Sequence, residues 1–162
     1  MSSIVVREKK PQDKAWITTL MLESWGSEQV VVQTRIFHPE QLPGFLAIMN
    51  DERIGLLTYQ LDPPNCEIIT LNSLQPGMGV GRSLMDSLQK TASSNGCTVL
   101  RLFTTNNNMD ALRFYQKYGF HLEKLIKDGV AADRKIKPEI PLKADNGIPI
   151  CDYLELTMRI NL

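Results

Sequence analysis

The spacing of apolar residues changes several times along the chain, and each change predicts the boundary of a helix or a strand. Alternating or continuous apolar runs predict strands at residues 4–7, 45–49, 54–61, 67–74, 98–104, 120–125 and 153–160. Apolar stripes at helical spacing predict helices around residues 16–21, 84–92 and 111–118, the first of them capped by Asp13. Residues 30–37 fit a strand or an apolar loop equally well, and residues 135–149 predict a proline-punctuated loop.

The order of these segments predicts how the strands pair. Residues 50–53 join two strands, which indicates an antiparallel hairpin with a four-residue turn. The strand at 98–104 follows a strand and a helix, so a right-handed crossover predicts that it runs parallel to the strand at 67–74. Simple alternation along that earlier strand puts Glu67 on one face with Ile69, Leu71 and Ser73. The pattern as a whole predicts an α/β (α+β) fold.

The junction between the strand at 67–74 and the next helix is rich in glycine. After Pro76, Gly77, Gly79 and Gly81 occupy every second position and lead directly into the helical spacing. The start of a helix directs unpaired N–H groups and a positive dipole end to one point, and glycine lets a ligand approach the main chain. We therefore expect an anion there, most plausibly a phosphate, with Arg82 adding a positive charge.

Length, charge and cysteine usage restrict the kind of protein. The 162 residues fit a single domain, 1–162, and the 18 basic residues balance 18 acidic ones, so no net field favours nucleic acid or an anionic membrane. Cys66, Cys97 and Cys151 are far apart and match neither a disulfide framework nor a zinc site, so no metal is expected. Without a signal peptide or an apolar run of about 20 residues, the chain is expected to be soluble and cytoplasmic.

Two common glycine-loop motifs do not fit the residues. A Walker loop needs Gly-Lys-Ser/Thr where Gly81 is followed by Arg82 and Ser83, and a dinucleotide fingerprint needs a small residue at Leu84. The junction instead resembles the core motif of the GNAT family of acyl-CoA-dependent N-acyltransferases, Gln/Arg-x-x-Gly-x-Gly/Ala. Gly79, Val80 and Gly81 supply its last three positions, whereas Pro76 stands where the family has Gln or Arg.

A second family motif lies downstream at the expected distance. Its pattern, Asn-x-x-Ala-x-x-x-Tyr-x-x-x-Gly-Phe, is met in full by Asn108, Ala111, Tyr115, Gly119 and Phe120. The segments Lys-Pro-Glu-Ile-Pro (137–141) and Gly-Ile-Pro-Ile (147–150) resemble one branch of the family, in which Asp-Glu is usual where this chain has Asp-Tyr at 152–153. The resemblance implies a mixed, mostly antiparallel sheet with a central splayed parallel strand pair and helices on both faces.

The resemblance also implies roles for particular residues. Leu71, Asn72, Ser73 and Leu74 would hold the pantetheine arm of acetyl-CoA, and Met78, Gly79, Val80, Gly81, Arg82 and Ser83 its pyrophosphate. Tyr115 corresponds to the tyrosine that protonates the departing thiolate, and Asn108 contacts the coenzyme or caps its helix. Glu67 is the expected base for the amine, with Asp152 and Glu52 as alternatives.

These roles lead to the hypothesis of an acetyl-CoA-dependent N-acetyltransferase that works by direct transfer in a ternary complex, without metal. The alternatives are a non-catalytic acyl-CoA-binding or sensing module and, third, a nucleotide-binding domain. The acceptor amine stays open, although residues 25–37 and 135–150 are expected to border its pocket. Pairing of two copies into a homodimer is a further expectation.

Overall fold

The computed structural model describes residues 3–161, which form two compact units. The first unit comprises the residues up to Val30, His38–Leu100 and the residues from Arg159 onwards. The second unit comprises Val31–Phe37 and Arg101–Met158. Each unit is described by itself below.

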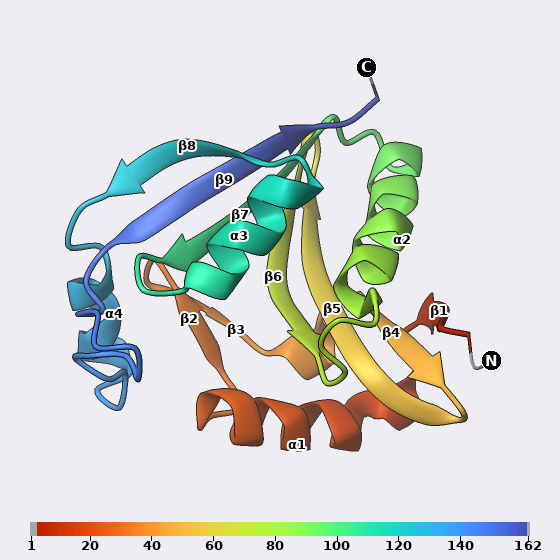
Figure 1. Ribbon diagram of the computed structural model, residues 1–162, viewed down its shortest axis with the longest axis horizontal. Coiled ribbons are helices and arrows are strands. Elements are labelled where there is room, and N and C mark those ends of the chain that lie inside the picture. The colour runs from red at the N-terminus through yellow and green to blue at the C-terminus, as the bar shows by residue number, and fades with distance from the viewer. Residues whose placement is uncertain (1–2, 162) are drawn as a thin grey trace. The chain divides into compact units, whose positions relative to one another are not determined.

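Strands of the first unit form its sheet, and Figure 1 draws them with their labels. In spatial order they are β1 (Val5–Glu8), β4 (Gly44–Met49), β5 (Glu52–Asp62), β6 (Asn65–Ser73) and the first residues of β7 (Val99–Thr105). The first four pair as antiparallel neighbours. The amides of Thr98 and Val99 both donate to the Pro64 carbonyl, 2.8 and 3.1 Å away, so β6 and β7 begin side by side and run parallel. The predicted antiparallel hairpin and the predicted parallel pair are both confirmed.

The turn between β4 and β5 is shorter than the sequence suggested. Met49 pairs with Glu52, so only Asn50 and Asp51 form the turn, and the predicted four-residue turn is wrong. Both residues are left-handed, with φ of 52° and 63°. Asn and Asp tolerate this conformation, which matches the twist of the flanking strands in a two-residue hairpin.

Helices cover both faces of this sheet. On one face, a Cβ on Gly55 would lie 2.5 Å from Val80 Cγ1, so the absence of a side chain lets helix α2 (Val80–Ser94) pack closely on β5. Gly55 pairs with Ser73, and the neighbouring Asn72 therefore points to the opposite face. There its Nδ2 donates to Ser24 Oγ of helix α1 (Lys14–Trp25), 3.4 Å away.

Asp13 has a different role from the predicted helix cap. Its side chain makes no capping hydrogen bond to α1. Instead the fully buried carboxylate accepts two bonds from Arg7, at 2.8 and 2.9 Å, and one from Arg53 Nε at 2.9 Å. These bonds tie the short 3₁₀ helix at Pro11–Asp13 to β1 and β5. A second 3₁₀ helix lies at Pro39–Gln41.

The second unit contains the rest of β7, followed in spatial order by β9 (Tyr153–Arg159) and β8 (His121–Ile126). Figure 1 draws β8 and β9 side by side as antiparallel strands that are joined through α4 (Val130–Ile136) and the segment after it, and α3 (Met109–Tyr118) completes the unit. Residues 30–37, which the sequence left open, form strands β2 (Val30–Val32) and β3 (Arg35–Phe37). The stretch contains both short strands and a tight turn, and this explains its mixed pattern.

Helix α4 also organises the proline-rich segment, which has more structure than the sequence indicated. The Arg134 side chain donates to the carbonyls of Ile140, Pro141 and Ile150, at 3.3, 2.6 and 2.5 Å. Lys143 and Pro149 form an isolated antiparallel bridge. One guanidinium therefore holds both halves of the motif that suggested a family branch.

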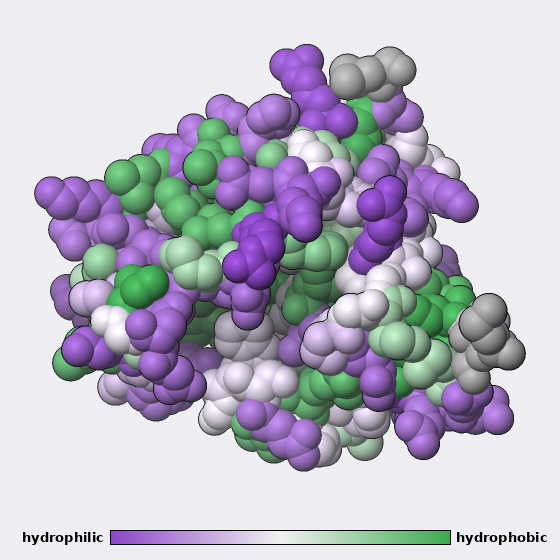
Figure 2. Space-filling view, in the orientation of Figure 1, coloured by the Kyte–Doolittle hydropathy of each residue, from purple (hydrophilic) through white to green (hydrophobic). Residues whose placement is uncertain are grey.

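The β8 edge of the second unit carries apolar side chains at its surface. Leu122 and Leu125 are more than half exposed, and Figure 2 shows apolar surface in the region where Figure 1 draws β8 and β9. Among residues 3–161 there is no helix of sufficient length and apolar character to cross a membrane.

Candidate functional site

A β-bulge changes which residues share a face of β6. Thr58 pairs with Thr70 and the next residue, Tyr59, pairs with Ile68, so Ile69 is left out of the ladder. Because paired residues share a face, Glu67 faces the same way as Thr70 and Asn72. The predicted grouping of Glu67 with Leu71 and Ser73 is therefore wrong, since it assumed an uninterrupted strand.

The face that carries Glu67 is polar and largely closed to solvent. Glu67 is 6% exposed, and the buried hydroxyls of Thr58 and Thr70 lie 2.6 Å apart. Asn72 completes this row with its bond to Ser24 of α1. A carboxylate, hydroxyls and an amide thus line the α1 side of β6, and these groups can hold a polar acceptor or an ordered water.

The main chain at the end of β6 is bonded to β5 along one of its two edges. The Leu74 amide donates to the Ile54 carbonyl of β5 at 2.8 Å. Backbone groups alternate between the two edges of a strand, so the amides of Leu71 and Ser73 point away from β5. An extended ligand that presents amide groups could pair with this edge as a strand would.

The glycine-rich loop ends in the open N-terminus of α2. Gly77 and Gly79 have φ of 80° and 79°, and a Cβ at either position would meet no atom within 4 Å. Gly79 is the N-cap, and the Ser83 amide is the first to bond back into the helix, to the Gly79 carbonyl at 3.0 Å. The amides of Val80, Gly81 and Arg82 therefore have no partner one turn earlier, and the dipole end favours an anion.

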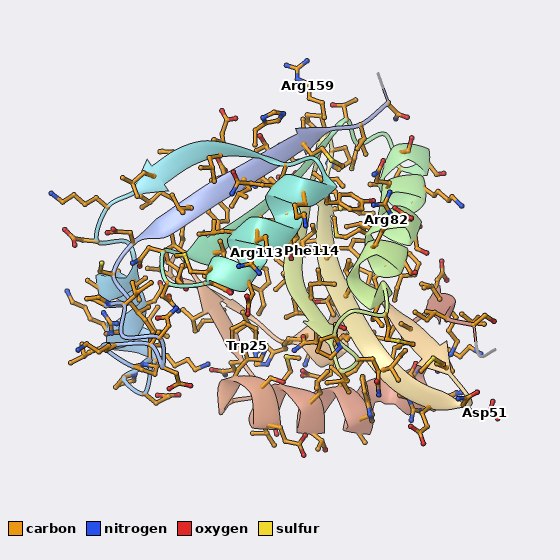
Figure 3. The ribbon with its side chains drawn as sticks, in the orientation of Figure 1. Trp25, Asp51, Arg82, Arg113, Phe114 and Arg159 are labelled. Carbon is orange, nitrogen blue, oxygen red and sulfur yellow. The ribbon has the colours of Figure 1, made fainter. Side chains whose placement is uncertain are left out.

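The residues around this loop are accessible. Residues 73–79 are exposed, Pro76 and Met78 among them, so the residue that departs from the family motif lies in a solvent-facing turn. Arg82 is exposed on the first turn of α2, where Figure 3 labels it. The positive charge of Arg82 and the positive dipole end of α2 would both attract a phosphate.

Of the three consecutive asparagines in the second unit, one caps the helix as predicted. The Asn108 side chain accepts a hydrogen bond from the Ala111 amide, 3.3 Å away, at the start of α3. Asn106 instead accepts from the amides of Cys151 and Asp152 and donates to the Pro149 carbonyl. It therefore anchors the proline-rich segment and not the helix.

Tyr115 lies on the buried side of α3. It is 7% exposed, and its ring packs edge-on against Phe114 and Phe120, with ring centres 5.2 and 5.4 Å apart. Burial raises the pKa of the Tyr115 phenol above its ordinary value, because the charged phenolate would lose its hydration. The hydroxyl therefore keeps its proton at neutral pH and can act as a donor.

The two alternative bases differ from Glu67 in their contacts and exposure. Asp152 accepts a hydrogen bond from the Asp128 amide at 2.8 Å, and Glu52 is an exposed residue beside the β4–β5 turn.

Two of the cysteines are poorly suited to act as nucleophiles. Cys66 and Cys97 are buried, and burial raises the pKa of Cys66 to about 12, which disfavours the nucleophilic thiolate. Within residues 3–161, no group of three or more His, Cys, Asp or Glu side chains is placed to hold a metal.

The structure also reveals residues that the sequence did not single out. Asp133 of α4 is completely buried and accepts bonds from the Gln33 and Thr34 amides and from the Tyr153 hydroxyl. A buried aspartate partnered by backbone amides a hundred residues away leaves no local pattern in the sequence. Arg134 of the same helix was not singled out either, although its partners Ile140, Pro141 and Ile150 lie nearer in the chain.

Comparison with known proteins agrees with this arrangement. The model of the acetyltransferase (GNAT) family matches residues 11–120, and the chain therefore belongs to that family. The chain is 38% identical over 148 residues to the uncharacterized protein YxbD of Bacillus subtilis (strain 168), covering 91% of this chain and 93% of that protein.

Solved structures share the fold over nearly the whole chain. An IAA acetyltransferase from Bacillus cereus ATCC 14579 matches with a TM-score of 0.76 and 24% identity, covering 98% of this chain and 100% of that one. A GNAT family acetyltransferase from Elizabethkingia anophelis with acetyl-CoA bound matches with a TM-score of 0.69 and 20% identity, covering 97% and 98%. The mixed, mostly antiparallel sheet with one parallel pair is thus the fold of acetyltransferases.

Proposed function

We propose that this protein transfers the acetyl group of acetyl-CoA to the nitrogen of an amine by direct transfer in a ternary complex. The observation that carries the proposal is the start of α2, where three amides with no partner one turn earlier follow two left-handed glycines with open space around them. Membership of the acetyltransferase family and the acetyl-CoA-bound neighbour support acetyl-CoA as the cosubstrate.

In this proposal the first unit binds the coenzyme through its main chain. The pyrophosphate lies against Met78–Ser83, on the amides of the loop and of α2, with Arg82 adding charge. The pantetheine arm pairs with the outward edge of Leu71–Leu74. Asn108 of the second unit both caps α3 and contacts the coenzyme.

The reaction needs a neutral amine and a proton for the leaving sulfur. Glu67, through a water, first takes a proton from the ammonium, and the neutral amine nitrogen then attacks the thioester carbonyl. The C–S bond breaks as Tyr115 donates its proton to the thiolate of CoA, and the second proton that leaves the acylated nitrogen restores the Tyr115 phenol. The protonated state of the buried phenol supports this role. No step requires a metal or a covalent enzyme intermediate.

Four further expectations from the sequence stay part of the proposal. The chain is taken as one catalytic domain in the cytoplasm, and the resemblance of residues 137–141 and 147–150 to one branch of the family supports membership of that branch. The exposed leucines of the edge strand β8 support pairing of two copies. Analytical ultracentrifugation of wild type and Leu125→Glu tests this, since a dimer that persists in the variant would exclude β8 as the contact.

Calorimetric titration with acetyl-CoA, followed by assays of thiol release with a panel of amines, tests the proposed function. We expect saturable binding and amine-dependent release of CoA. Binding without release for every amine would favour the alternative, a non-catalytic acyl-CoA-binding module. If acetyl-CoA does not bind, both the acetyltransferase and the acyl-CoA-binding module are rejected. Tight binding of ATP or NAD instead of acetyl-CoA would favour a nucleotide-binding domain.

A further inference from the structure

Two buried threonines of the first unit face each other across β5 and β6. Thr58 and Thr70 pair in the ladder, are 0% and 2% exposed, and have their hydroxyl oxygens 2.6 Å apart. Two hydroxyls carry two hydrogens, and only one of these can lie between the two oxygens. Among residues 3–161, neither hydroxyl has a hydrogen bond to any group other than its neighbour. One hydroxyl hydrogen of the pair therefore needs an acceptor that the protein chain does not supply.

Water is the acceptor that such a hydrogen finds in a protein interior. A buried O–H group without an acceptor is costly, and buried polar groups that lack a protein partner are satisfied by ordered water. A buried water makes about three hydrogen bonds and needs at least two polar partners. The threonine pair supplies one of these partners, so a second polar group must lie nearby on the same side of the sheet.

Glu67 is the next residue on this face of β6. The bulge at Ile69 brings Glu67 to the face of Thr70, and the cross-strand partners of these two residues, Gln60 and Thr58, are two residues apart on β5. Two strand residues span about 7 Å, a separation that a glutamate side chain and one water can bridge. A carboxylate accepts at about four sites, so Glu67 can bind this water in addition to its other contacts.

The row of polar side chains is closed at the threonines and reaches solvent beside Glu67. Gln60, the cross-strand partner of Glu67, is exposed, whereas both threonines are buried. A water between the threonine pair and Glu67 would thus be held by buried groups on one side. Its other side would face the part of the row that an acceptor can approach.

We propose that the Thr58–Thr70 pair holds the water through which Glu67 takes a proton from the acceptor. The inference rests on the proposed acetyl transfer. The second hydroxyl hydrogen of the pair donates to the water oxygen and the water donates to the Glu67 carboxylate, which leaves one lone pair of the water for the ammonium. A proton passes from the ammonium to the water oxygen as a proton of the water passes to Glu67, and the amine becomes neutral. Thr58 and Thr70 are therefore positioning residues.

The double variant Thr58→Val/Thr70→Val tests this role. Valine keeps the branched shape of threonine, and replacing both partners together leaves no buried hydroxyl without a partner, so the variant should fold. Thr70→Ser retains the hydroxyl. Thr91→Val is the matched control, because Thr91 is half-buried on α2, which packs on the opposite face of the sheet. Circular dichroism and urea unfolding check that all variants fold.

We expect the double variant to lower kcat about tenfold at neutral pH and to leave the affinity for acetyl-CoA unchanged, because the water serves only the proton transfer. The loss should shrink as the pH rises, since solvent then deprotonates the amine. Thr70→Ser should keep most of the activity, and Thr91→Val should keep all of it. An unchanged kcat in the double variant would overturn the proposal.

Combining these changes with Glu67→Gln distinguishes positioning from a general structural effect. If the threonines act only through the water of Glu67, the two valines should lower kcat no further when Glu67 is already glutamine. Losses that multiply in the combined variant would mean that the threonines act independently of Glu67 and would also overturn the proposal.

A crystal structure that shows ordered water tests the site without acetyl transfer. In wild type we expect a water within hydrogen-bonding distance of both the threonine pair and the Glu67 carboxylate, and in the double variant we expect this water to be gone. If wild type has no water there but acetylates amines, this inference is rejected and the proposed function stands. If the water is present and no amine is acetylated, the water site is supported, whereas its catalytic role and the proposed function are both rejected.

Discussion

Glu67 and Asn72 lie on the same face of β6 although they are five residues apart. In a regular strand an odd separation places two side chains on opposite faces, and the bulge at Ile69 reverses that relation. The expected base therefore shares the α1 side of the sheet with the Thr58–Thr70 hydroxyl pair and with the Asn72–Ser24 contact.

Replacing Glu67 by Gln should lower kcat by about ten- to a hundredfold at neutral pH, because the amide cannot take a proton from the acceptor. The loss should shrink as the pH rises, since solvent then deprotonates the amine. Initial rates across a pH series measure the effect. Glu52→Gln, at an exposed position of β5, is the control, and a larger loss there would transfer the role of base to Glu52.

Tyr115→Phe should lower kcat by about a hundredfold and leave the affinity for acetyl-CoA nearly unchanged, because the proton is needed only when the thiolate departs. Burial raises the pKa of the phenol, so the wild-type rate should not fall at mildly alkaline pH through loss of this proton. Steady-state rates and calorimetry separate the two effects. An unchanged kcat in the variant would exclude Tyr115 as the acid.

Gly79→Ala should weaken acetyl-CoA binding and cost about 1–2 kcal/mol of stability, because alanine is strained at φ of 79° and its Cβ enters space left for the ligand. Gly96→Ala is the matched control, since Gly96 has φ of 81°, open surroundings and a position beyond the far end of α2. Urea unfolding should show similar losses in both variants. Calorimetry should show weaker binding only in Gly79→Ala, and equal binding losses would contradict a phosphate site at the loop.

Asp13→Asn should destabilise the protein by about 3 kcal/mol at neutral pH, because Arg7 and Arg53 lose the buried carboxylate between them. The hydrogen bond from Arg7 is the largest cause that holds the pKa of Asp13 well below its ordinary value. This stabilisation is complete at neutral pH and is lost progressively as the pH falls below about 4, the value of an unfolded aspartate.

Urea unfolding at several pH values measures the Asp13 contribution. The difference between wild type and Asp13→Asn should narrow in acid, and Asp51→Asn, in the exposed β4–β5 turn labelled in Figure 3, should change little. If the difference in the free energy of unfolding stayed constant down to low pH, the stabilisation by Asp13 would not come from its charge.

Local patterns in the sequence predicted most of the elements and the pairing of β4 with β5 and of β6 with β7, but not α4 or the strands β2 and β3. Helical and strand spacing placed α2, α3 and the parallel β6–β7 pair, because these signals depend on neighbours within one or two turns. The bulge at Ile69 changed the face of Glu67 without any glycine or proline to mark it. Such a bulge is set by packing across the sheet, which spacing along one strand does not encode.

Some residues of interest could likewise be named from local motifs, whereas others are related only by the fold. Gly79, Asn108 and Tyr115 belong to contiguous motifs and could be identified directly. Asp133 accepts hydrogen bonds from the amides of Gln33 and Thr34, about a hundred residues earlier in the chain, so only the folded chain relates these residues. The residues proposed for the coenzyme could therefore be named from the sequence, whereas the contacts of Asp133 appear only in the structure.

The most direct test of the central claim is a steady-state assay with isotopically labelled acetyl-CoA and the amine of the panel that gives the fastest release of CoA. Product is followed by mass spectrometry, and the intact enzyme is weighed in the same samples. We predict N-acetylated amine in equal amount to the CoA released, intersecting lines in the double-reciprocal plots, and no label on the protein. Label that accumulates on the enzyme before product forms, or release of CoA without acetylated amine, would contradict direct transfer.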